Sequence, residues 1–579
     1  MATEKPLGSI IQGSLTKGLE VRLHPDISVE EMRVGKFLIV RGVRSRFFCL
    51  LTDVALGTAS PRILSNPPRP EDDFMQAVLA GSSTYGTIEL SPMLMLNQDL
   101  PDDLDLRELI AQENAAASQP GRSTLASYQP QTSAAIQLLP VKTIPTHFSQ
   151  VYEASERDFR VIFGWEDDPH RRNFAIGQPI DMDVPVCIDL DRFVERSNGV
   201  FGKSGTGKSF LTRLLLSGII RKDAAVNLIF DMHSEYGWEA VSEGKKFNTV
   251  KGLRQLFPGR VEVYTLDPDS ARRRGIRDAQ ELYLSYNQIE VEDLALVQRE
   301  LNLSEASLDS ANILRGEFGK NWIAQLIEMT NEDIQLFCDE KRGHKGSIMS
   351  LQRKLLRLDN LKYMRPSSKQ NSVERVMESL EAGKNVIVEF GSQSDMLSYM
   401  LVTNMITRRI HQAYVRKAEK FLASKNPCDR PQQLVITIEE AHRFLDPAIV
   451  RSTIFGNIAR EMRKYFVTLL VVDQRPSGID AEVMSQIGTR ITALLNDDKD
   501  IEAIFTGVSG GQSLRSVLAK LDSKQQALVL GHAVPMPVVI RTRLYDEQFY
   551  QEIADIDWEE MSDEAVLEAA VTAKSDLGF

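Results

Sequence analysis

The segment from residue 199 to residue 220, GVFGKSGTGKSFLTRLLLSGII, constrains the fold of this chain more than any other. An apolar, strand-like run leads into GKSGTGKS, which matches the pattern GxxxxGK[ST], and a helical pattern follows at once. Glycines in such a loop let backbone N–H groups curl around phosphate oxygens, and the helix directs its N-terminus at the same anion. The segment therefore predicts a strand–loop–helix unit that binds a nucleoside triphosphate.

Two side chains of this loop have specific expected roles. Lys208 is expected to reach the β- and γ-phosphates, and Ser209 is expected to ligate Mg²⁺. No guanine-reading NKxD sequence is present. The other expected nucleotide-binding residues of the loop are Gly202, Ser204, Gly205, Thr206 and Gly207.

A second motif, LVITIEEAHRFL at residues 434–445, distinguishes hydrolysis from other phosphate chemistry. A buried strand ends in two carboxylates, Glu439 and Glu440. The first is expected to support the Mg²⁺ shell through water, and the second to polarise an attacking water molecule. Adjacent carboxylates raise one another's pKa, so a pair of them at a strand tip costs free energy. The alternative is the solvated start of a loop.

A third motif, LLVVDQRPSGID at residues 469–480, carries an apolar strand to its tip and then displays Gln474. In open α/β sheets, ligands bind outside the carboxyl ends of the strands. Gln474 is therefore expected near the γ-phosphate, where a neutral amide senses phosphate or orients water. The alternative is a polar residue that caps a turn.

The order of patterns along the chain predicts an α/β protein with several domains. Short strands predict an N-terminal domain over 1–190 that is a small β-barrel or sandwich, with a flexible insertion at 113–135 that is rich in Ser, Gln and Ala. Strand–helix alternation predicts a RecA-like P-loop core with a mostly parallel sheet. The expected core covers 191–269 and 385–545, an inserted helical subdomain covers 270–384, and an acidic tail covers 546–579.

Charge and cysteine content indicate the cellular location of the protein, but they do not exclude DNA as a ligand. The net charge is -12, yet the segment 546–579 alone holds eleven acidic residues against one lysine, so the body is nearly neutral and DNA is not excluded. The four cysteines are scattered, and no apolar run is long enough to cross a bilayer. We therefore expect a cytoplasmic protein without a membrane partner.

The motifs GVFGKSGTGKS, FDMHSEYG, LVITIEEAHRFL and ARxxRKYxxxLLVVDQRPSGI occur in the order typical of one family. In this order, from about residue 7 to 545, the chain resembles the HerA family of FtsK-like P-loop motors. Its N-terminal strands resemble the HAS barrel of that family. The resemblance implies a homohexameric ring that hydrolyses ATP between subunits and passes double-stranded DNA through a central channel.

The resemblance also implies roles for individual residues. Glu440 is then the catalytic base and Gln474 the sensor of the γ-phosphate. The other residues that match family positions are Asp231 and Glu235 near the nucleotide, and Arg460, Arg463 and Arg196 as arginines that act across the subunit boundary. The alternatives are a capped turn for the two acids and a solvated helix face for the arginines. Glu439 stands where the family usually has an aspartate, a difference that bears on the Mg²⁺ water shell and on the hydrolysis rate.

Partners and DNA contacts follow less directly. No nuclease or protease constellation is visible, so any cutting is expected from a partner. The resemblance implies a NurA-like nuclease or a Sir2-like effector on the barrel, in DNA end processing or antiviral defence. The alternative is a nucleotide-dependent ring scaffold for such an effector, with little translocation. Candidate DNA-phosphate contacts are Arg272, Arg273, Arg274, Arg277, Lys341, Arg342 and Lys345, which otherwise form a solvated face.

Overall fold

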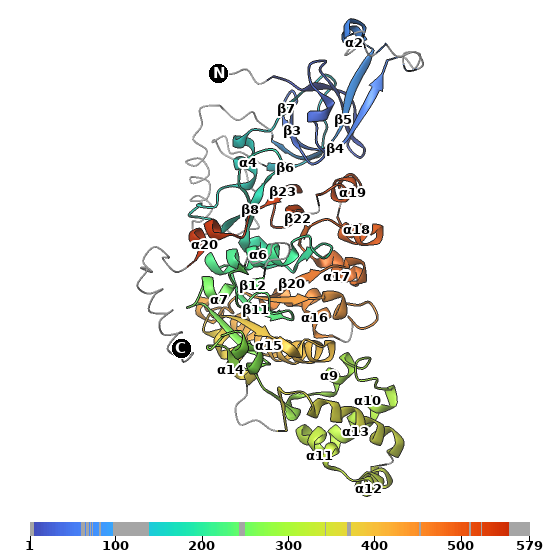
Figure 1. Cartoon of the computed structure of the whole chain (residues 1–579), viewed down its shortest axis with the longest axis vertical. Helices are drawn as coiled ribbons and strands as arrows, with labels where there is room; N and C mark the ends of the chain where they lie inside the picture. The colour runs from blue at the N-terminus through green and yellow to red at the C-terminus, as the bar shows by residue number, and fades with distance from the viewer. Residues whose placement is uncertain are drawn as a thin grey trace, which may run out of the picture.

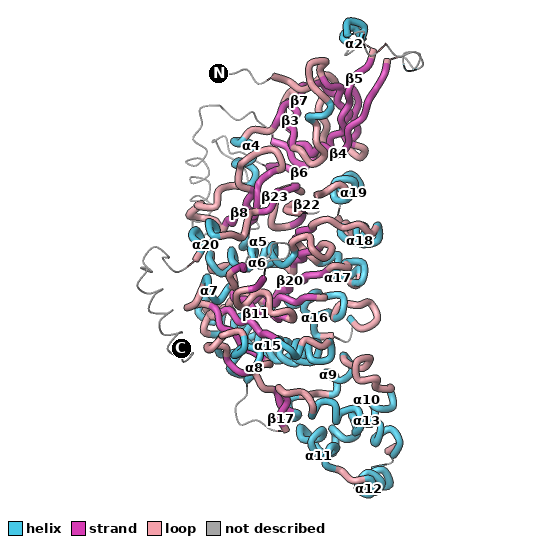
Figure 2. The backbone as a smooth tube through the Cα atoms, viewed as in Figure 1, coloured by secondary structure: helices cyan, strands magenta, loops and turns pink. Residues whose placement is uncertain are grey.

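A computed structural model of the chain places three regions in a row (Figure 1). A small β-barrel lies at one end, a large sheet with helices lies in the middle, and a group of helices lies at the other end. Figure 2 shows strands throughout the barrel and the middle region, and mostly helices at the far end. The structure describes residues 5–59, 64, 69, 71, 73–79, 83–96, 138–241, 249–341, 343–366, 372–450, 453–508, 511–522 and 524–554.

The N-terminal region is a closed antiparallel barrel. Its strand order is β2-β1-β7-β3-β4-β5, and pairing of β2 with β5 closes it, while β6 extends it beyond β5. Alternating apolar residues such as Leu19 and Val21 face a separate buried core inside the barrel. The strands are β1 (Gly8–Ser14), β2 (Gly18–Leu23), β3 (Phe37–Arg41), β4 (Arg46–Thr58), β5 (Thr84–Leu96), β6 (Leu138–Pro140) and β7 (Gln150–Glu153), and the short helix α2 (Asp73–Leu79) lies between β4 and β5.

The middle region is built on a 12-stranded sheet, in the order β15-β14-β18-β11-β19-β20-β10-β21-β22-β23-β8-β9. The pairs from β15 to β21 are parallel and the pairs from β21 to β9 are antiparallel. The strands are β8 (Asn173–Pro179), β9 (Val186–Asp189), β10 (Asn198–Phe201), β11 (Val226–Asp231), β14 (Val261–Thr265), β15 (Gln280–Glu281), β18 (Asn385–Glu389), β19 (Leu434–Glu439), β20 (Val467–Asp473), β21 (Thr489–Thr492), β22 (Gln526–Gly531) and β23 (Val538–Thr542).

Burial explains why the central strands were predictable. Every residue of β11, β19 and β20 is buried, because helices cover both faces of a parallel sheet. Such strands read as continuous apolar runs, and each of these three ends in a carboxylate at the same edge of the sheet. The predicted α/β fold, with a P-loop core and an N-terminal barrel, is confirmed.

Helices connect the strands of the middle region. The longest, α15, begins at Met396 and ends at Ser424, and α6, which follows the phosphate-loop motif, packs against β8, β10 and β11. The helices here are α4 (Glu156–Phe163), α5 (Leu190–Glu195), α6 (Lys208–Arg221), α7 (Leu253–Leu256), α8 (Pro268–Arg273), α14 (Ser372–Glu381), α15, α16 (Ile454–Glu461), α17 (Ala481–Gln486), α18 (Asp498–Ile504), α19 (Gly511–Ala519) and α20 (Glu547–Ile553).

The group of helices at the far end comes from the predicted insertion (Figure 1). Buried Trp322, Ile323 and Leu351 belong to its core. Its elements are α9 (Val291–Leu296), α10 (Glu305–Phe318), α11 (Trp322–Glu328), α12 (Asn331–Lys341), α13 (Lys345–Asp359) and the short pair β16 (Leu284–Ser285) with β17 (Met364–Arg365).

The structure bears on the predicted end of the N-terminal domain and on the predicted acidic tail. The N-terminal domain was predicted to extend to residue 190, but β8 and β9 are the last strands of the large sheet, so we propose a boundary before Asn173. Of the predicted acidic tail, α20 packs through Phe549, Tyr550 and Ile553. The predicted insertion at 113–135 and residues 555–579 lie outside the described residues. Within the described part of the chain, we find no helix with the length and apolarity needed to span a membrane.

Candidate functional site

The predicted phosphate loop lies between the end of β10 and the start of α6. Gly202, Gly205 and Gly207 have φ angles of 154°, 77° and 92°, a region that side-chain-bearing residues rarely adopt. A Cβ atom on Gly205 or Gly207 would meet nothing within 4 Å, so backbone conformation rather than crowding requires glycine there. The loop therefore has the curled backbone that a phosphate cradle needs.

Neighbouring strands fix the base of this loop. The Gly202 N–H donates to the carbonyl of Asp473 (3.3 Å), and the Lys203 N–H donates to the carbonyl of Leu494 (3.1 Å). The Lys208 ammonium donates to the Lys203 carbonyl (3.0 Å), so the chain itself satisfies it until a phosphate oxygen replaces that acceptor. The loop thus fits the phosphates of ATP, with Ser209 following at the start of α6.

Glu439, at the end of β19, is a buried carboxylate. Its Oε1 accepts a hydrogen bond from the Tyr236 hydroxyl (2.9 Å), whereas its Oε2 has no partner among the described residues. Burial, and then the charges of Asp231 and Glu235, raise the pKa of Glu439 well above its ordinary value. A divalent cation would supply the positive charge that this carboxylate lacks, so the residue fits a role in a Mg²⁺ shell.

No group of three or more His, Cys, Asp or Glu side chains in the described residues is arranged to hold a metal ion. Mg²⁺ keeps several waters and binds through one or two protein groups and the phosphates of a substrate. Ser209 and Glu439 are the residues that would hold it.

Asp231 and Glu235, both predicted near the nucleotide, have different surroundings. The Asp231 carboxylate accepts hydrogen bonds from the backbone N–H groups of Glu235 (2.8 Å), Tyr236 (2.8 Å) and Gly237 (3.4 Å). It therefore caps the turn after β11, which is the alternative given for it above. The Glu235 carbonyl accepts from the Arg213 guanidinium (2.8 Å), which ties the turn to α6.

Glu389 is a fourth acid at this edge, and the sequence analysis missed it. It ends β18 beside Asp231 and is fully buried. Burial, and then the charge of Asp231, raise its pKa to about 7, although Arg274 lies 2.6 Å away and lowers it. The signal in the sequence was NVIVEF, an apolar strand that ends in a glutamate like its neighbours in the sheet.

Glu440 and Gln474 meet at the tips of adjacent strands. The Gln474 Nε2 donates to the Glu440 Oε1 (3.3 Å), so the predicted base and the predicted sensor are in contact. Glu440 has a φ of 46°, and a non-glycine residue in this left-handed region marks stored strain, which clusters at functional sites. Glu440 and Gln474 therefore lie together at the edge where the phosphate loop begins.

His442 and Asp473, neither of which was predicted as a site residue, also belong to this group. Asp473 is 1% exposed and accepts from the backbone N–H of His442 (2.6 Å) and of Arg475 (2.6 Å). The His442 Nδ1 lies 3.0 Å from Asp473 Oδ2 and 3.6 Å from Glu440 Oε2. The hydrogen bond to Asp473 raises the pKa of His442.

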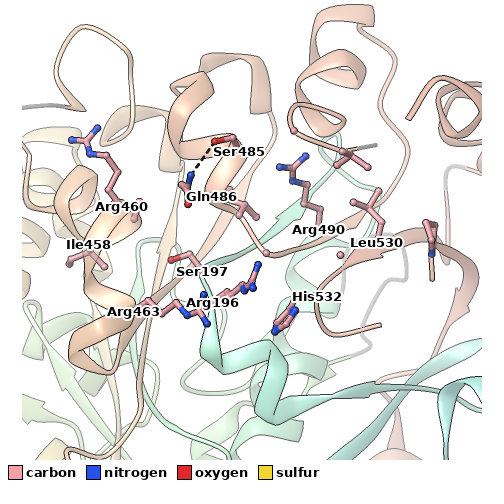
Figure 3. A pocket seen from close by; sticks show the side chains of 17 residues that line it. Arg196, Ser197, Ile458, Arg460, Arg463, Ser485, Gln486, Arg490, Leu530 and His532 are labelled. Carbon is pink, nitrogen blue, oxygen red and sulfur yellow. Dashed lines mark hydrogen bonds between the residues drawn. The ribbon is translucent and has the colours of Figure 1, made fainter. Parts of the chain in front are cut away.

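The three predicted trans-acting arginines line one cavity of about 400 Å³ (Figure 3). Arg196 follows α5, and Arg460 and Arg463 come from α16 and the turn after it. Arg463 forms an ion pair with Glu195, which also lies 3.2 Å from the His532 ring, and Arg460 lies 3.7 Å from Glu482. Residues that are distant in sequence thus create one basic pocket.

This basic pocket does not belong to the same edge of the sheet as the phosphate loop. Arg463 precedes β20 and Gln474 follows it, while Arg196 precedes β10 and Gly202 follows it. A strand of seven residues spans about 20 Å. The arginines and the phosphate loop of one chain are therefore on opposite edges of the parallel strands.

Internal ion pairs occupy several of the predicted DNA-contact residues. Arg274 pairs with Glu389 (2.6 Å), Arg272 with Asp269 (3.1 Å), and Lys341 with Glu317 (2.9 Å). Arg342 lies outside the described residues. The structure does not gather this predicted set into one site.

Two family profiles and several named proteins are similar to this chain. Residues 174–410 match the profile of a family described as "Helicase HerA, central domain", and residues 7–113 match the "HAS barrel domain". The DNA double-strand break repair helicase HerA of Pyrococcus furiosus is 23% identical over 439 residues, which cover 71% of this chain and 76% of that protein. The protein of the same name from Sulfolobus acidocaldarius is 22% identical, with 74% and 80% covered. The solved structure of VirB4 from Thermoanaerobacter pseudethanolicus is 13% identical with a TM-score of 0.42, and covers 64% of this chain and 96% of that one.

Proposed function

Because this chain belongs to the HerA family of P-loop ATPases, we propose that it is a DNA-translocating, helicase-type ATPase whose catalytic sites form between neighbouring copies in a homohexameric ring. One observation carries the proposal. The phosphate loop and Glu440 lie at one edge of the parallel sheet, and the basic pocket lies at the other. A neighbouring copy that presents its pocket to this edge would complete the site.

The residues of one chain would bind and orient the nucleotide. The curled loop from Gly202 to Gly207 supplies backbone N–H groups, and Lys208 exchanges its contact with the loop carbonyl for a phosphate oxygen. Mg²⁺, when held by Ser209 and Glu439, neutralises charge on the phosphates. Glu440 accepts a proton from the attacking water, and Gln474 orients that water as an uncharged donor.

The neighbouring chain would supply positive charge. An arginine that acts in trans stabilises the charge on the transferring phosphoryl group. Arg463 is our first choice, because its side chain is 56% exposed and its partner Glu195 is also accessible, so a phosphate can replace that carboxylate. Arg460 and Arg196, which line the same pocket, would add to the positive field.

Double-stranded DNA is the proposed polymer substrate. Relatives that cover most of this chain are named DNA double-strand break repair helicases. A translocating ring binds the phosphate backbone without regard to sequence. Duplex DNA is therefore expected to stimulate ATP turnover.

A partner nuclease or effector is proposed to dock on the barrel. Large apolar side chains are exposed where α2 lies beyond the end of β4, with Leu56 83% and Phe74 76% exposed. Exposed apolar side chains that gather on one region are typical of binding surfaces. The same observation favours the second candidate function, a nucleotide-dependent ring scaffold that assembles an effector with little translocation.

DNA-stimulated ATPase activity separates the two functions. We expect turnover of the purified chain to rise when long duplex DNA is added, and to rise less when salt weakens phosphate contacts. Turnover that duplex DNA leaves unchanged, in a ring that still hydrolyses ATP, would refute the motor and favour the scaffold.

A further inference from the structure

We propose that His442, held in place by Asp473, positions the Glu440 carboxylate for its role as general base. The proposal rests on the proposed function, since it takes Glu440 as that base. Glu440 is an N-cap residue with a φ of 46°, and its side chain is 27% exposed. Both of its carboxylate oxygens lie next to polar neighbours.

The two oxygens of Glu440 face two different polar groups. Oε1 accepts from the Gln474 amide (3.3 Å), and Oε2 lies 3.6 Å from the His442 Nδ1. The imidazole is closer to Asp473 Oδ2, at 3.0 Å, so it stands between the carboxylates of Asp473 and Glu440. This arrangement limits the rotation of the Glu440 side chain from both sides.

Asp473 is a rigid support for the imidazole. It ends the buried strand β20, and its own carbonyl accepts from the Gly202 N–H of the phosphate loop (3.3 Å). The His442 side chain also packs close to Gly478, where an added Cβ would lie 3.1 Å from the His442 Cβ. Asp473 therefore connects the position of Glu440 to that of the phosphate loop through one short chain of contacts.

The contact with Asp473 also determines which ring nitrogen carries a proton. A carboxylate acceptor favours the Nδ1–H form, and the charges of Asp473 and Glu440 support the imidazolium, while nearby Arg443 opposes it. The turn itself needs only the backbone N–H of His442, which donates to Asp473 regardless of the side chain. The ring is therefore available for a purpose beyond capping.

Substitutions at His442 can separate positioning from folding. Asparagine places an N–H donor close to the position of Nδ1, whereas glutamine places it one bond farther away and alanine removes it. We expect His442→Ala to lower kcat about 100-fold, as expected for a misplaced catalytic group. The dissociation constant for ATP, measured by binding alone, should change less than about threefold, because the phosphate loop is intact.

The ranking of the His442 variants by kcat decides the test. We expect His442→Asn to restore most of kcat and His442→Gln to restore little, with His170→Ala, an exposed histidine before β8, unchanged as the control. Should His442→Ala fail to fold, the Asn and Gln variants still decide, since both keep a polar side chain. Equal kcat values for these two, or wild-type kcat for His442→Ala, would overturn the proposal.

The variant Glu440→Gln, measured in the same assays, distinguishes failure of the His442 proposal from failure of the proposed function. If Glu440→Gln turns over ATP normally, the assignment of the base is wrong. If Glu440→Gln is inactive while His442→Ala matches the wild type, only the role of His442 is wrong.

Discussion

The two edges of the parallel sheet differ in how their charged groups are held. At the edge with the phosphate loop, acids are buried and fixed, as in the contacts of Glu439 with Tyr236 and of Asp473 with His442. At the opposite edge, Arg463 is 56% exposed and lies in an open cavity with Glu195 as its partner. The difference suggests that the first edge is organised before the ligand arrives, and that the second is kept free to meet another molecule.

Removing the phosphate contact should have the largest effect. Lys208→Ala deletes the ammonium that would bind the β- and γ-phosphates, and we expect ATP binding to be lost. A fluorescent ATP analogue measures this directly. Lys222→Ala, at the other end of α6, should bind normally as the matched control. Tight binding to Lys208→Ala would mean that the loop does not hold the phosphates.

Removing Arg463 should affect turnover and spare binding, which sharpens the contrast between the edges. We expect Arg463→Ala to lower kcat by about 10³-fold or more, because a trans arginine stabilises charge only during transfer. Lys464→Ala removes the adjacent exposed cation and should behave like the wild type. Equal loss of ATP binding in Arg463→Ala and Lys208→Ala would contradict a division of labour between the edges.

Neutralising the proposed base should also separate binding from hydrolysis. Glu440→Gln keeps a side chain of the same shape but cannot accept a proton, so we expect kcat to fall about 10²- to 10⁴-fold while ATP stays bound. Retention of labelled ATP after gel filtration measures this state. The exposed Glu419→Gln on α15 is the control. Rapid release of ADP and phosphate from Glu440→Gln would exclude this role.

The smallest effect is expected from the buried acid Glu389. Its pKa of about 7 in the folded chain exceeds the ordinary 4.5, so folding favours the protonated form. Its contribution to stability is therefore full below about pH 4.5 and falls as the pH rises through about 7. Because glutamine does not titrate, the free energy of unfolding of Glu389→Gln should fall by roughly 2–3 kcal/mol less than that of the wild type over this pH range. The melting temperatures of the variant and the wild type are measured from about pH 5 to pH 8. Melting temperatures that change with pH by the same amount in both proteins would contradict this prediction.

The phosphate-loop edge was largely predictable from the sequence, because buried parallel strands read as apolar runs and their polar tips follow immediately. The strands within the motifs at 434–445 and 469–480 were predicted in this way, and they end at Glu439 and Asp473. The boundary that we propose for the barrel differs from the predicted one because β8 pairs with β23, which lies far along the chain, and β9 pairs with β8. No local pattern reports such long-range antiparallel pairing.

Contacts between motifs were the other part that sequence reasoning could not supply. His442 and Asp473 are 31 positions apart, and only the parallel pairing of β19 with β20 brings them together. The role of the arginines was inferred from family resemblance, and their gathering in one pocket depends on the turns that precede β10 and β20. Spacing along the chain contains neither piece of information.

Mixing two inactive variants tests the division of the site between copies most directly. Lys208→Ala keeps Arg463, and Arg463→Ala keeps the phosphate loop. In rings co-expressed from both variants at equal amounts, about a quarter of the interfaces would pair an intact loop with an intact arginine. We predict that such rings regain ATP turnover that neither variant shows alone. Mixed rings as inactive as the separate variants would contradict a site shared between neighbours.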